Sequence, residues 1–379
     1  MAQPTAPTPP IRAHIFGTYP EALFSKQFPG TIPEWGGVTF TFGKDVAPDA
    51  DVLIVHIRAS YSIPTHLPKE RTVFLAGEPE VIHPYARRFL EQFGLVILPG
   101  DRPLDTEIWR ENHGQCWFAG IDFPPEGGFG EIRGYDWLNT LEVPQGKLDR
   151  ISVVTSDKNF TSYHKQRLVF LDELKQLIPD RLDLFGRGTR SIGDKAEALL
   201  PYKYHLALEN TGGADTWTEK LSDPLLCWTF PFYAGCTNPQ DYVPADALRP
   251  IDLTQPKVAA QQMVDDITSN RWQSALPAIA EARKRLLHDW NQANLLARAA
   301  RFAFDRPVAD PSGRRRLIRS ERSLWPEPGT RGSLGQWALR ASLLRLDPKI
   351  ELRMDRLVQW NDELKSARRR RRNKQKESQ

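Results

Sequence analysis

The fold is decided by one stretch, residues 202–253, which reads YKYHLALENTGGADTWTEKLSDPLLCWTFPFYAGCTNPQDYVPADALRPIDL. The apolar run at residues 204–208 is typical of a short buried strand. Thr216 or Thr218 can cap a helix that is predicted for residues 219–228. The chain therefore leaves a strand, turns through Gly212-Gly213 and enters a helix, which is the repeating unit of an α/β sheet.

Two acid-plus-partner pairs lie at the ends of these predicted elements. Glu209-Asn210 follows the strand, and Glu219-Lys220 opens the helix. The free N–H groups and the dipole of a helix N-terminus favour a bound phosphate, and a lysine there adds a positive charge. A glutamate beside it can accept hydrogen bonds from sugar hydroxyls. The pattern indicates a nucleotide-sugar site, and the alternative is a salt-bridged helix start in an ordinary α/β domain.

Short β-branched or aromatic runs bounded by Gly, Pro or Asp extend this pattern over most of the chain. In the first half they predict strands at 12–17, 37–43, 51–57, 71–76 and 94–98, with a helix at 82–93. In the second half they predict strands at 151–155, 182–185, 229–233 and 249–253, with helices at 165–177 and 195–200. Strands that alternate with helices form parallel sheets, so two layered α/β halves are expected.

The length of 379 residues suggests roughly two domains. Residues 110–147, rich in Gly, Pro and Trp, are interpreted as loop and interdomain connection. Long helices are predicted at 258–267, 276–304 and 350–365. The expected organisation is a Pro-rich lead-in (1–10), an N-terminal acceptor-side α/β domain (11–147), a C-terminal nucleotide-sugar-binding α/β domain (148–305), a helical extension (306–364) and a basic tail (365–379).

The charge is unevenly distributed. The formal net charge is +4, but residues 365–379 hold eight basic residues and one acid, so the rest of the chain is net acidic. A solvated basic tail can attract anionic headgroups. The three cysteines form no framework, the first residues lack the pattern of a secretory signal, and no run reaches the ~18 apolar residues of a membrane span. We expect a cytoplasmic protein with reduced thiols, and the tail makes a peripheral place at the inner face of the membrane an alternative.

Several blocks within residues 151–253 have the order and spacing of a known family. They are ISVVTS with Arg167 downstream, LDLFGRG, YKYHLALEN, the TEKL of Thr218–Leu221, the FPFYAG of Phe230–Gly235, and the DYVPADALRPIDL that follows. Together they resemble the C-terminal domain of glycosyltransferase family 10, the α-1,3/α-1,4-fucosyltransferases. In the first half, Gly77-Glu78-Pro79 more weakly resembles the family's Gly-Glu element. From about residue 255 onward no motif of the family is found.

The resemblance implies two Rossmann-like domains facing a cleft, the arrangement called GT-B, with C-terminal helices beyond them. It implies inverting transfer of fucose from GDP-fucose, held mainly by the second domain, to a glycan hydroxyl. In these roles it implies Glu78 as the general base, Arg167 and Lys220 at the diphosphate, Glu219 at the ribose, and Glu209, Asn210, Trp217 and Thr218 around the sugar donor. Trp217 stands where many members carry Tyr, so any contact of that phenolic hydroxyl is lost.

No metal cofactor is expected, because two cations already cover the diphosphate; a divalent metal is compatible with the site but not implied. Asp49-Ala50-Asp51 has the form of a metal-binding Asp-x-Asp motif, but it immediately precedes a strand, where Asp commonly forms a turn. Lys158 and Arg187 are weaker phosphate candidates in nearby loops.

The residues allow alternative partners as well. The same fold can transfer another GDP-sugar, and a non-catalytic glycan-binding protein at the membrane surface would make use of the basic tail. A bacterial surface glycan such as lipopolysaccharide is suggested as the acceptor by analogy alone. A nucleic-acid partner is not expected, since the body of the chain is net acidic.

Overall fold

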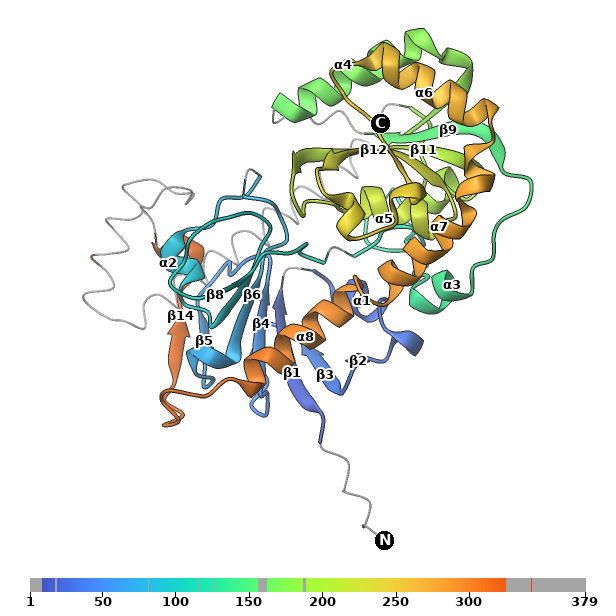
Figure 1. Cartoon of the computed structure of the whole chain (residues 1–379). Coiled ribbons are helices and arrows are strands. Elements are labelled where there is room, and N and C mark those ends of the chain that lie inside the picture. The colour runs from blue at the N-terminus through green and yellow to red at the C-terminus, as the bar shows by residue number, and fades with distance from the viewer. Residues whose placement is uncertain are drawn as a thin grey trace, which may run out of the picture. The chain divides into compact units, whose positions relative to one another are not determined.

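The computed structural model describes residues 9–17, 19–80, 82–114, 116–125, 127–155, 162–186, 189–324 and 342. Their contacts divide the chain into two compact α/β units (Figure 1). Unit 1 is formed by the described residues of Met1–Glu21, Glu34–Trp109 and Leu296–Gln379, and unit 2 by those of Ala22–Pro33 and Arg110–Leu295. The predicted helix at 350–365, the basic tail and most of the Pro-rich lead-in lie outside the described residues.

Unit 1 is built on a seven-stranded sheet that is parallel except for its first pair. In sheet order the strands are β2 (Glu34–Trp35), β3 (Val38–Phe42), β1 (Ile11–Gly17), β4 (Val52–His56), β6 (Thr72–Leu75), β7 (Leu95–Ile97) and β8 (Glu107–Trp109). The five predicted strands of the first half are thus confirmed. Every residue of β4 and β6 is buried, as expected of strands covered on both faces.

The helix predicted at 82–93 is wrong for its first half. Only one turn, α2 (Arg87–Leu90), is helical. Pro84 disfavours the helical conformation for the residue before it, so the chain from Ile82 to Ala86 forms a loop. This loop follows Glu78 in the chain.

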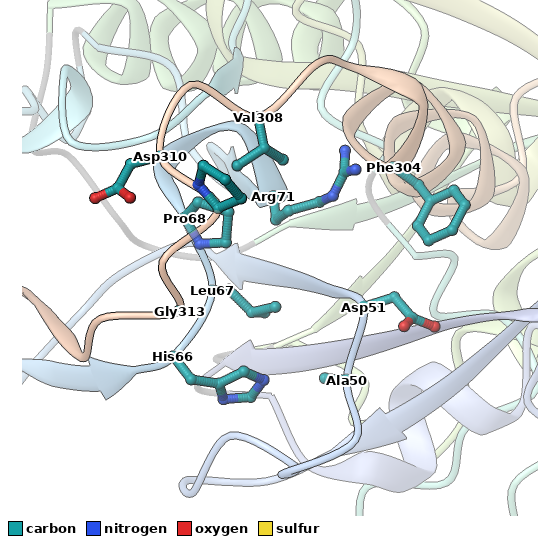
Figure 2. A pocket seen from close by; sticks show the side chains of 11 residues that line it. Ala50, Asp51, His66, Leu67, Pro68, Arg71, Phe304, Val308, Asp310 and Gly313 are labelled. Carbon is teal, nitrogen blue, oxygen red and sulfur yellow. The ribbon is translucent and has the colours of Figure 1, made fainter.

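The C-terminal segment of unit 1 packs on the loops at the amino ends of β4 and β6. There it encloses a hollow of about 350 Å³, into which Phe304 and Val308 project from the segment (Figure 2). Arg71 lies in the hollow and donates from Nη1 to the carbonyl oxygens of Ala303 and Arg306. Arg71, just before β6, therefore holds the C-terminal segment by hydrogen bonds to two of its carbonyl oxygens.

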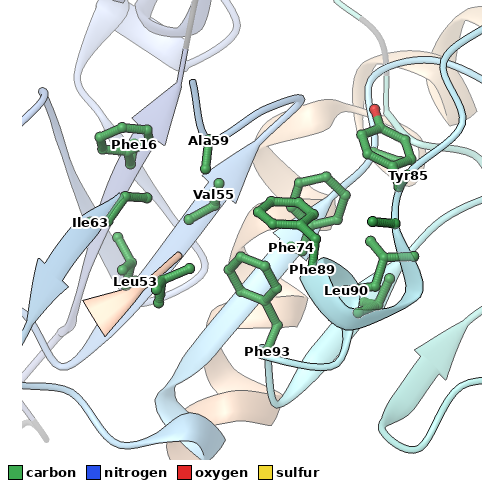
Figure 3. Close-up of a cluster of buried hydrophobic side chains, with 14 of the residues drawn as sticks. Phe16, Leu53, Val55, Ala59, Ile63, Phe74, Tyr85, Phe89, Leu90 and Phe93 are labelled. Atoms are coloured by element: carbon green, nitrogen blue, oxygen red, sulfur yellow. The ribbon is translucent and has the colours of Figure 1, made fainter. Parts of the chain in front are cut away.

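The same segment also closes the core of unit 1. Its strand β14 (Arg316–Ile318) pairs antiparallel with β5 (Ile63–Thr65), and a 3-10 helix follows at Glu321–Leu324. Ile318 and Leu324 join the buried cluster around Phe74, Phe89 and Phe93 that Figure 3 shows in part. The expected helical extension from residue 306 is therefore, as far as residue 324, a strand and a short 3-10 helix.

Unit 2 is built on a five-stranded, fully parallel sheet. In sheet order the strands are β10 (Leu182–Gly186), β9 (Leu148–Thr155), β11 (Tyr202–Gly213), β12 (Phe230–Cys236) and β13 (Arg249–Pro250). From β9 the chain runs first to β10 on one side and then to β11 on the other. Ligands of open α/β sheets bind beyond the carboxyl ends of the strands at such a reversal.

Helices cover both faces of this sheet. Figure 1 shows α4 (Ser162–Leu177) and α6 (Pro256–Thr268) on one face, with α5 (Glu219–Leu226) and α7 (Arg271–Leu287) on the other. The long helix predicted at 276–304 is two helices, α7 and α8 (Gln292–Asp305), because Asn291 caps a new start by accepting from the N–H of Ala293. The short helix predicted at 195–200 is a 3-10 turn at Lys195–Ala198. Smaller elements are α1 (Glu21–Ser25), α3 (Tyr135–Thr140) and 3-10 turns at Pro29–Thr31, Lys69–Arg71, Pro179–Arg181, Pro239–Asp241 and Ala245–Ala247.

Residues 110–147 differ most from their expected role. Apart from α3 they are irregular, as predicted, but they pack within unit 2. The N–H of Phe118 donates to Asp223, that of Gly120 donates to Asp194, and Asn112 donates to the carbonyl of Trp217. The contact boundary thus falls near residue 110 and again inside α8, whereas 147 and 305 were expected. Within the described residues, no helix has both the length and the apolar character needed to cross a bilayer.

Candidate functional site

The carboxyl end of β11 carries a buried carboxylate that organises the helix after it. Glu209 is 1% exposed and accepts from both the N–H (2.8 Å) and the hydroxyl (2.7 Å) of Thr218. Thr218 is the N-cap of α5, and its hydroxyl also accepts from the N–H of Lys220 at 3.3 Å. Strand end and helix start are thereby tied together, which confirms the predicted strand–turn–helix unit and its cap.

The glycine of the FPFYAG block explains how Glu209 fits there. A Cβ on Gly235 would lie 2.2 Å from Cγ of Glu209, so no other residue can stand beside this carboxylate without moving it. The hydroxyl of Tyr233 on the same strand lies 3.3 Å from Oε1 of Glu209 and can donate to it. The FPFYAG block therefore leaves room for the side chain of Glu209 at Gly235 and offers it a hydrogen-bond donor at Tyr233.

Lys220 lies between two carboxylates at the start of α5. Its Nζ is 3.0 Å from Oε1 of Glu219 and 3.8 Å from Oε2 of Glu209. Burial works against its charge, but the two glutamates outweigh burial and raise the pKa of Lys220. Burial also disfavours the charge of Glu209 and raises its pKa, while Lys220 opposes this shift. The three groups form one interlocked set at the helix N-terminus.

Arg167 approaches the same strand end from α4. It is 5% exposed, and its Nη1 donates to Oδ1 of Asn210 at 2.9 Å and to the carbonyl of Leu208 at 3.4 Å. Its Nε and Nη2 are buried and have no hydrogen-bond partner among the described residues. Arg167 and Lys220 thus approach consecutive residues of β11, Asn210 at 2.9 Å and Glu209 at 3.8 Å. A buried guanidinium with unused donors is arranged to receive an anion.

A hollow of about 550 Å³ opens at the carboxyl ends of β11, β12 and β13, next to these groups. Tyr163 and Gln166, from the first turns of α4, form one wall of it. The hollow adjoins the cluster through Tyr233, whose hydroxyl lies 3.3 Å from Oε1 of Glu209, while Arg167, Glu219 and Lys220 are not among its lining residues. The rest of the lining comes from the strand ends and the turns after them, including Gly212, Gly213, Tyr233, Thr237, Gln240, Asp252 and Leu253. The space suits a group the size of a nucleoside.

Two charged residues of the cluster were missed by the sequence reasoning. Nζ of Lys195 lies 2.8 Å from Oδ2 of Asp223 and 4.0 Å from Oε1 of Glu219. A signal for Lys195 exists in the sequence: Asp194 and Glu197 form a capping box, which fixes Lys195 at the first position of a helical turn. Nothing comparable marks Asp223, whose position one turn after Glu219 needs the structure to become meaningful.

Trp217 is placed differently from the other predicted site residues. Its side chain is 1% exposed and packs edge-on against Tyr242, with ring centroids 5.5 Å apart. The ring is therefore part of the packed interior beneath the cap. Lys158 and Arg187, the weaker phosphate candidates, lie outside the described residues.

Glu78, the predicted base, lies in unit 1 on the loop after β6 and is half-buried. Beside it, a Cβ on Gly77 would lie 2.1 Å from Cγ1 of Ile57, so the glycine is required for close packing. Charges at Glu78 and at Glu321 both act on Tyr85, whose pKa is raised mainly by burial.

This loop is braced at two further points. Nη1 of Arg102 donates to Oε1 of Glu80 and to the carbonyl of Tyr85, each at 2.5 Å. Nε2 of His83 lies 2.8 Å from Oε2 of Glu321. The segment that closes the core of unit 1 therefore also holds the loop that carries Glu78.

The Asp-x-Asp sequence serves a different purpose. Nη2 of Arg12 lies 2.9 Å from Asp51, and Nη1 lies 3.4 Å from Asp49. The side-chain hydrogen bond from Arg12 lowers the pKa of Asp51. Among the described residues no group of three or more His, Cys, Asp or Glu side chains is placed to hold a metal ion. The two aspartates, which precede β4, are therefore ion-pair partners of Arg12 on β1.

Comparison with models of protein families and with curated proteins gives no match. Among solved structures the chain is similar to an α1,3-fucosyltransferase at 16% identity, over 73% of this chain and 84% of that one, with a TM-score of 0.45. An α1,3-fucosyltransferase solved with GDP-fucose gives 15% identity over the same shares and a TM-score of 0.42. A glycosyltransferase of kitacinnamycin gives 11% identity over 77% and 100%, with a TM-score of 0.36. These are distant likenesses, so the function has to be argued from the side chains.

Proposed function

We propose that the chain is an inverting glycosyltransferase that moves fucose from GDP-fucose to a hydroxyl of a glycan. The observation that carries the proposal is Arg167, a buried guanidinium with two donor nitrogens that have no partner among the described residues. It bonds to Asn210 at the end of β11, where the preceding residue, Glu209, lies 3.8 Å from Lys220. A diphosphate satisfies both cations, because it offers several anionic oxygens within a few ångströms. The hollow beyond β11–β13 then receives the nucleoside.

The chemical step assigned here needs a base and a stabilised leaving group. Glu78 takes the proton of the acceptor hydroxyl, whose oxygen attacks the anomeric carbon as the bond to the diphosphate breaks. Arg167 and Lys220 stabilise the negative charge that develops on GDP. Glu219 and Asn210 fix the nucleotide. We also propose that no metal is required, since two cations serve the diphosphate; chelator-treated protein is then expected to retain turnover.

The binding half of the proposal is tested by calorimetry with GDP on the full chain. Lys220→Ala and Glu219→Ala are expected to abolish measurable GDP binding while far-UV circular dichroism stays unchanged. Arg150→Met is the matched control, because Arg150 pairs with Asp183 at 2.6 Å in the same unit, near the start of β9. Unchanged GDP affinity in the Lys220 and Glu219 variants would show that the site is assigned wrongly.

The identity of the sugar rests on the resemblance of the sequence blocks and needs its own experiment. Turnover of GDP-fucose and of GDP-mannose is compared on an array of acceptor glycans with labelled sugar donor. The proposal expects transfer from GDP-fucose to at least one acceptor. Transfer from GDP-mannose alone would keep the diphosphate site and replace the sugar. Removal of residues 365–379 tests the membrane alternative: we expect turnover on soluble acceptors to remain and liposome binding to fall.

A further inference from the structure

Lys195 is held in place by an unusually complete set of contacts. Asp194, the residue before it, caps the 3-10 turn by accepting from the N–H of Ala196 at 2.7 Å. The same carboxylate accepts from the N–H of Gly120 at 2.9 Å and from Nη2 of Arg133 at 2.6 Å. The backbone of Lys195 is therefore fixed from two other segments of unit 2.

The ammonium group of Lys195 is directed at the start of α5. It lies 2.8 Å from the fully buried carboxylate of Asp223, donates to the carbonyl of Glu219 at 3.4 Å and lies 4.0 Å from that residue's Oε1. Glu219 thus stands between two ammonium groups, since Lys220 is 3.0 Å from the same Oε1. Each lysine also has a second, buried carboxylate: Asp223 lies 2.8 Å from Lys195, whereas Glu209 lies 3.8 Å from Lys220, whose side chain is the more exposed of the two.

A diphosphate at Lys220 competes with Glu219 for that ammonium group. We propose that Lys195 is a positioning residue that keeps Glu219 ionised and in place while Lys220 turns to the diphosphate. This inference rests on the proposed function, because it needs Lys220 to bind an anion. Glu219 then stays available to accept hydrogen bonds from the nucleotide, whichever way Lys220 points.

Glu219 is surrounded by several charged and titratable groups, and its pKa depends on all of them. Burial works to raise its pKa, but Lys220 and Lys195 outweigh burial and lower the pKa to about 2. Two further carboxylates, a buried imidazole and a buried thiol also face it: Glu209, Asp223, His113 and Cys116. With Lys220 turned to an anion, Lys195 is the remaining cation of this set, so its loss raises the pKa of Glu219.

The test measures the GDP affinity of full-length variants between pH 5 and pH 8. The quantity compared is the ratio of the variant's Kd to the parent's at each pH, which cancels the titration of GDP itself. For Lys195→Met we expect this ratio to grow by on the order of tenfold from pH 8 to pH 5, one pKa unit's worth of lost ionisation. Lys195→Arg keeps the charge and is expected to hold the ratio near 1.

Two further variants separate positioning from mere stability. Lys203→Met removes a lysine paired with Asp149 at 2.7 Å in the same unit and is expected to show no pH-dependent ratio. Lys195→Met with Asp223→Asn removes both charges of the buried pair, so the fold is kept even if the single variant fails. Because this also removes a negative charge that acts on Glu219, a smaller pH effect in the same direction is expected. A ratio that does not change with pH in this double variant overturns the inference. If the parent chain binds no GDP at all, the proposed function fails instead.

Discussion

Both units place carboxylates at the carboxyl ends of parallel strands, but they hold them in different ways. In unit 2 Glu209 and Glu219 are fixed by ion pairs and a helix cap, so each charge has a charged neighbour within 4 Å. In unit 1 Glu78 sits half-buried on a loop that is braced at Gly77, Glu80 and His83. The first arrangement suits a site that must bind tightly, and the second suits a group that must exchange a proton.

The sharpest way to separate the two regions is to neutralise the exchanging group. Glu78→Gln is expected to lower turnover by about 10²–10⁴-fold, the usual contribution of a general base. GDP affinity should stay at the parent's value, since Glu78 belongs to unit 1. Steady-state turnover and calorimetry on the same sample check this. A loss of GDP affinity equal to the loss of turnover would contradict the division of labour.

Crowding Glu209 in unit 2 should instead impair GDP binding. Gly235→Ala puts a Cβ 2.2 Å from Cγ of Glu209, so Glu209 must move and the cap of α5 is displaced. We expect about 2–3 kcal/mol of lost stability and a loss of GDP binding, because a buried hydrogen-bonded group is disturbed. Gly77→Ala is the counterpart in unit 1, where the clash is with Ile57. Gly77→Ala should impair turnover and spare GDP binding. Thermal unfolding, calorimetry with GDP and steady-state turnover on both variants check the loss of stability, the loss of binding and the loss of activity.

A milder change tests the brace of the loop. Glu321→Gln weakens the contact with His83 and is expected to lower turnover about tenfold, because the position of the base becomes less defined. Glu91→Gln is the control, since Glu91, at the end of α2, pairs with the exposed Arg87 in the same unit. Equal effects from both substitutions would mean that the brace has no bearing on catalysis.

The smallest effect concerns the stability of unit 2 alone. Nζ of Lys147 donates to the carbonyls of Leu199, Leu200 and Cys227, and burial lowers its pKa to about 7. Since the unfolded chain keeps this proton up to about pH 10, stability should rise with pH above 7, by at most about 1 kcal/mol between pH 7 and 8. Lys147→Met should flatten that rise in denaturant titrations. An unchanged slope would assign the rise to another group.

The sequence was sufficient for features that depend on local pattern. Five of the seven strands in the sheet of unit 1 and the strand–turn–helix unit around Thr218 were predicted from short runs of residues. The family resemblance assigned Arg167 and Asn210 to one donor site, but their hydrogen bond was not predicted. What it missed depends on contacts distant in the chain. Pro84 was overlooked inside an otherwise helical pattern, which is a local error. Lys195 and Asp223 could not be paired from the sequence, because nothing local relates a residue of one turn to a helix beyond the next strand.

Unit 1 cannot complete itself until late in synthesis. Its sheet is made from the first third of the chain, yet Ile318 fills its core and β14 pairs with β5. Unit 2, by contrast, has nearly all its residues once position 295 has emerged, including the borrowed Ala22–Pro33. During translation the later lobe can therefore fold first, while the nascent strands of the earlier one wait with apolar faces uncovered. A chaperone acting on this protein would be expected to hold the first hundred residues, and a chain halted before residue 318 should be captured by it.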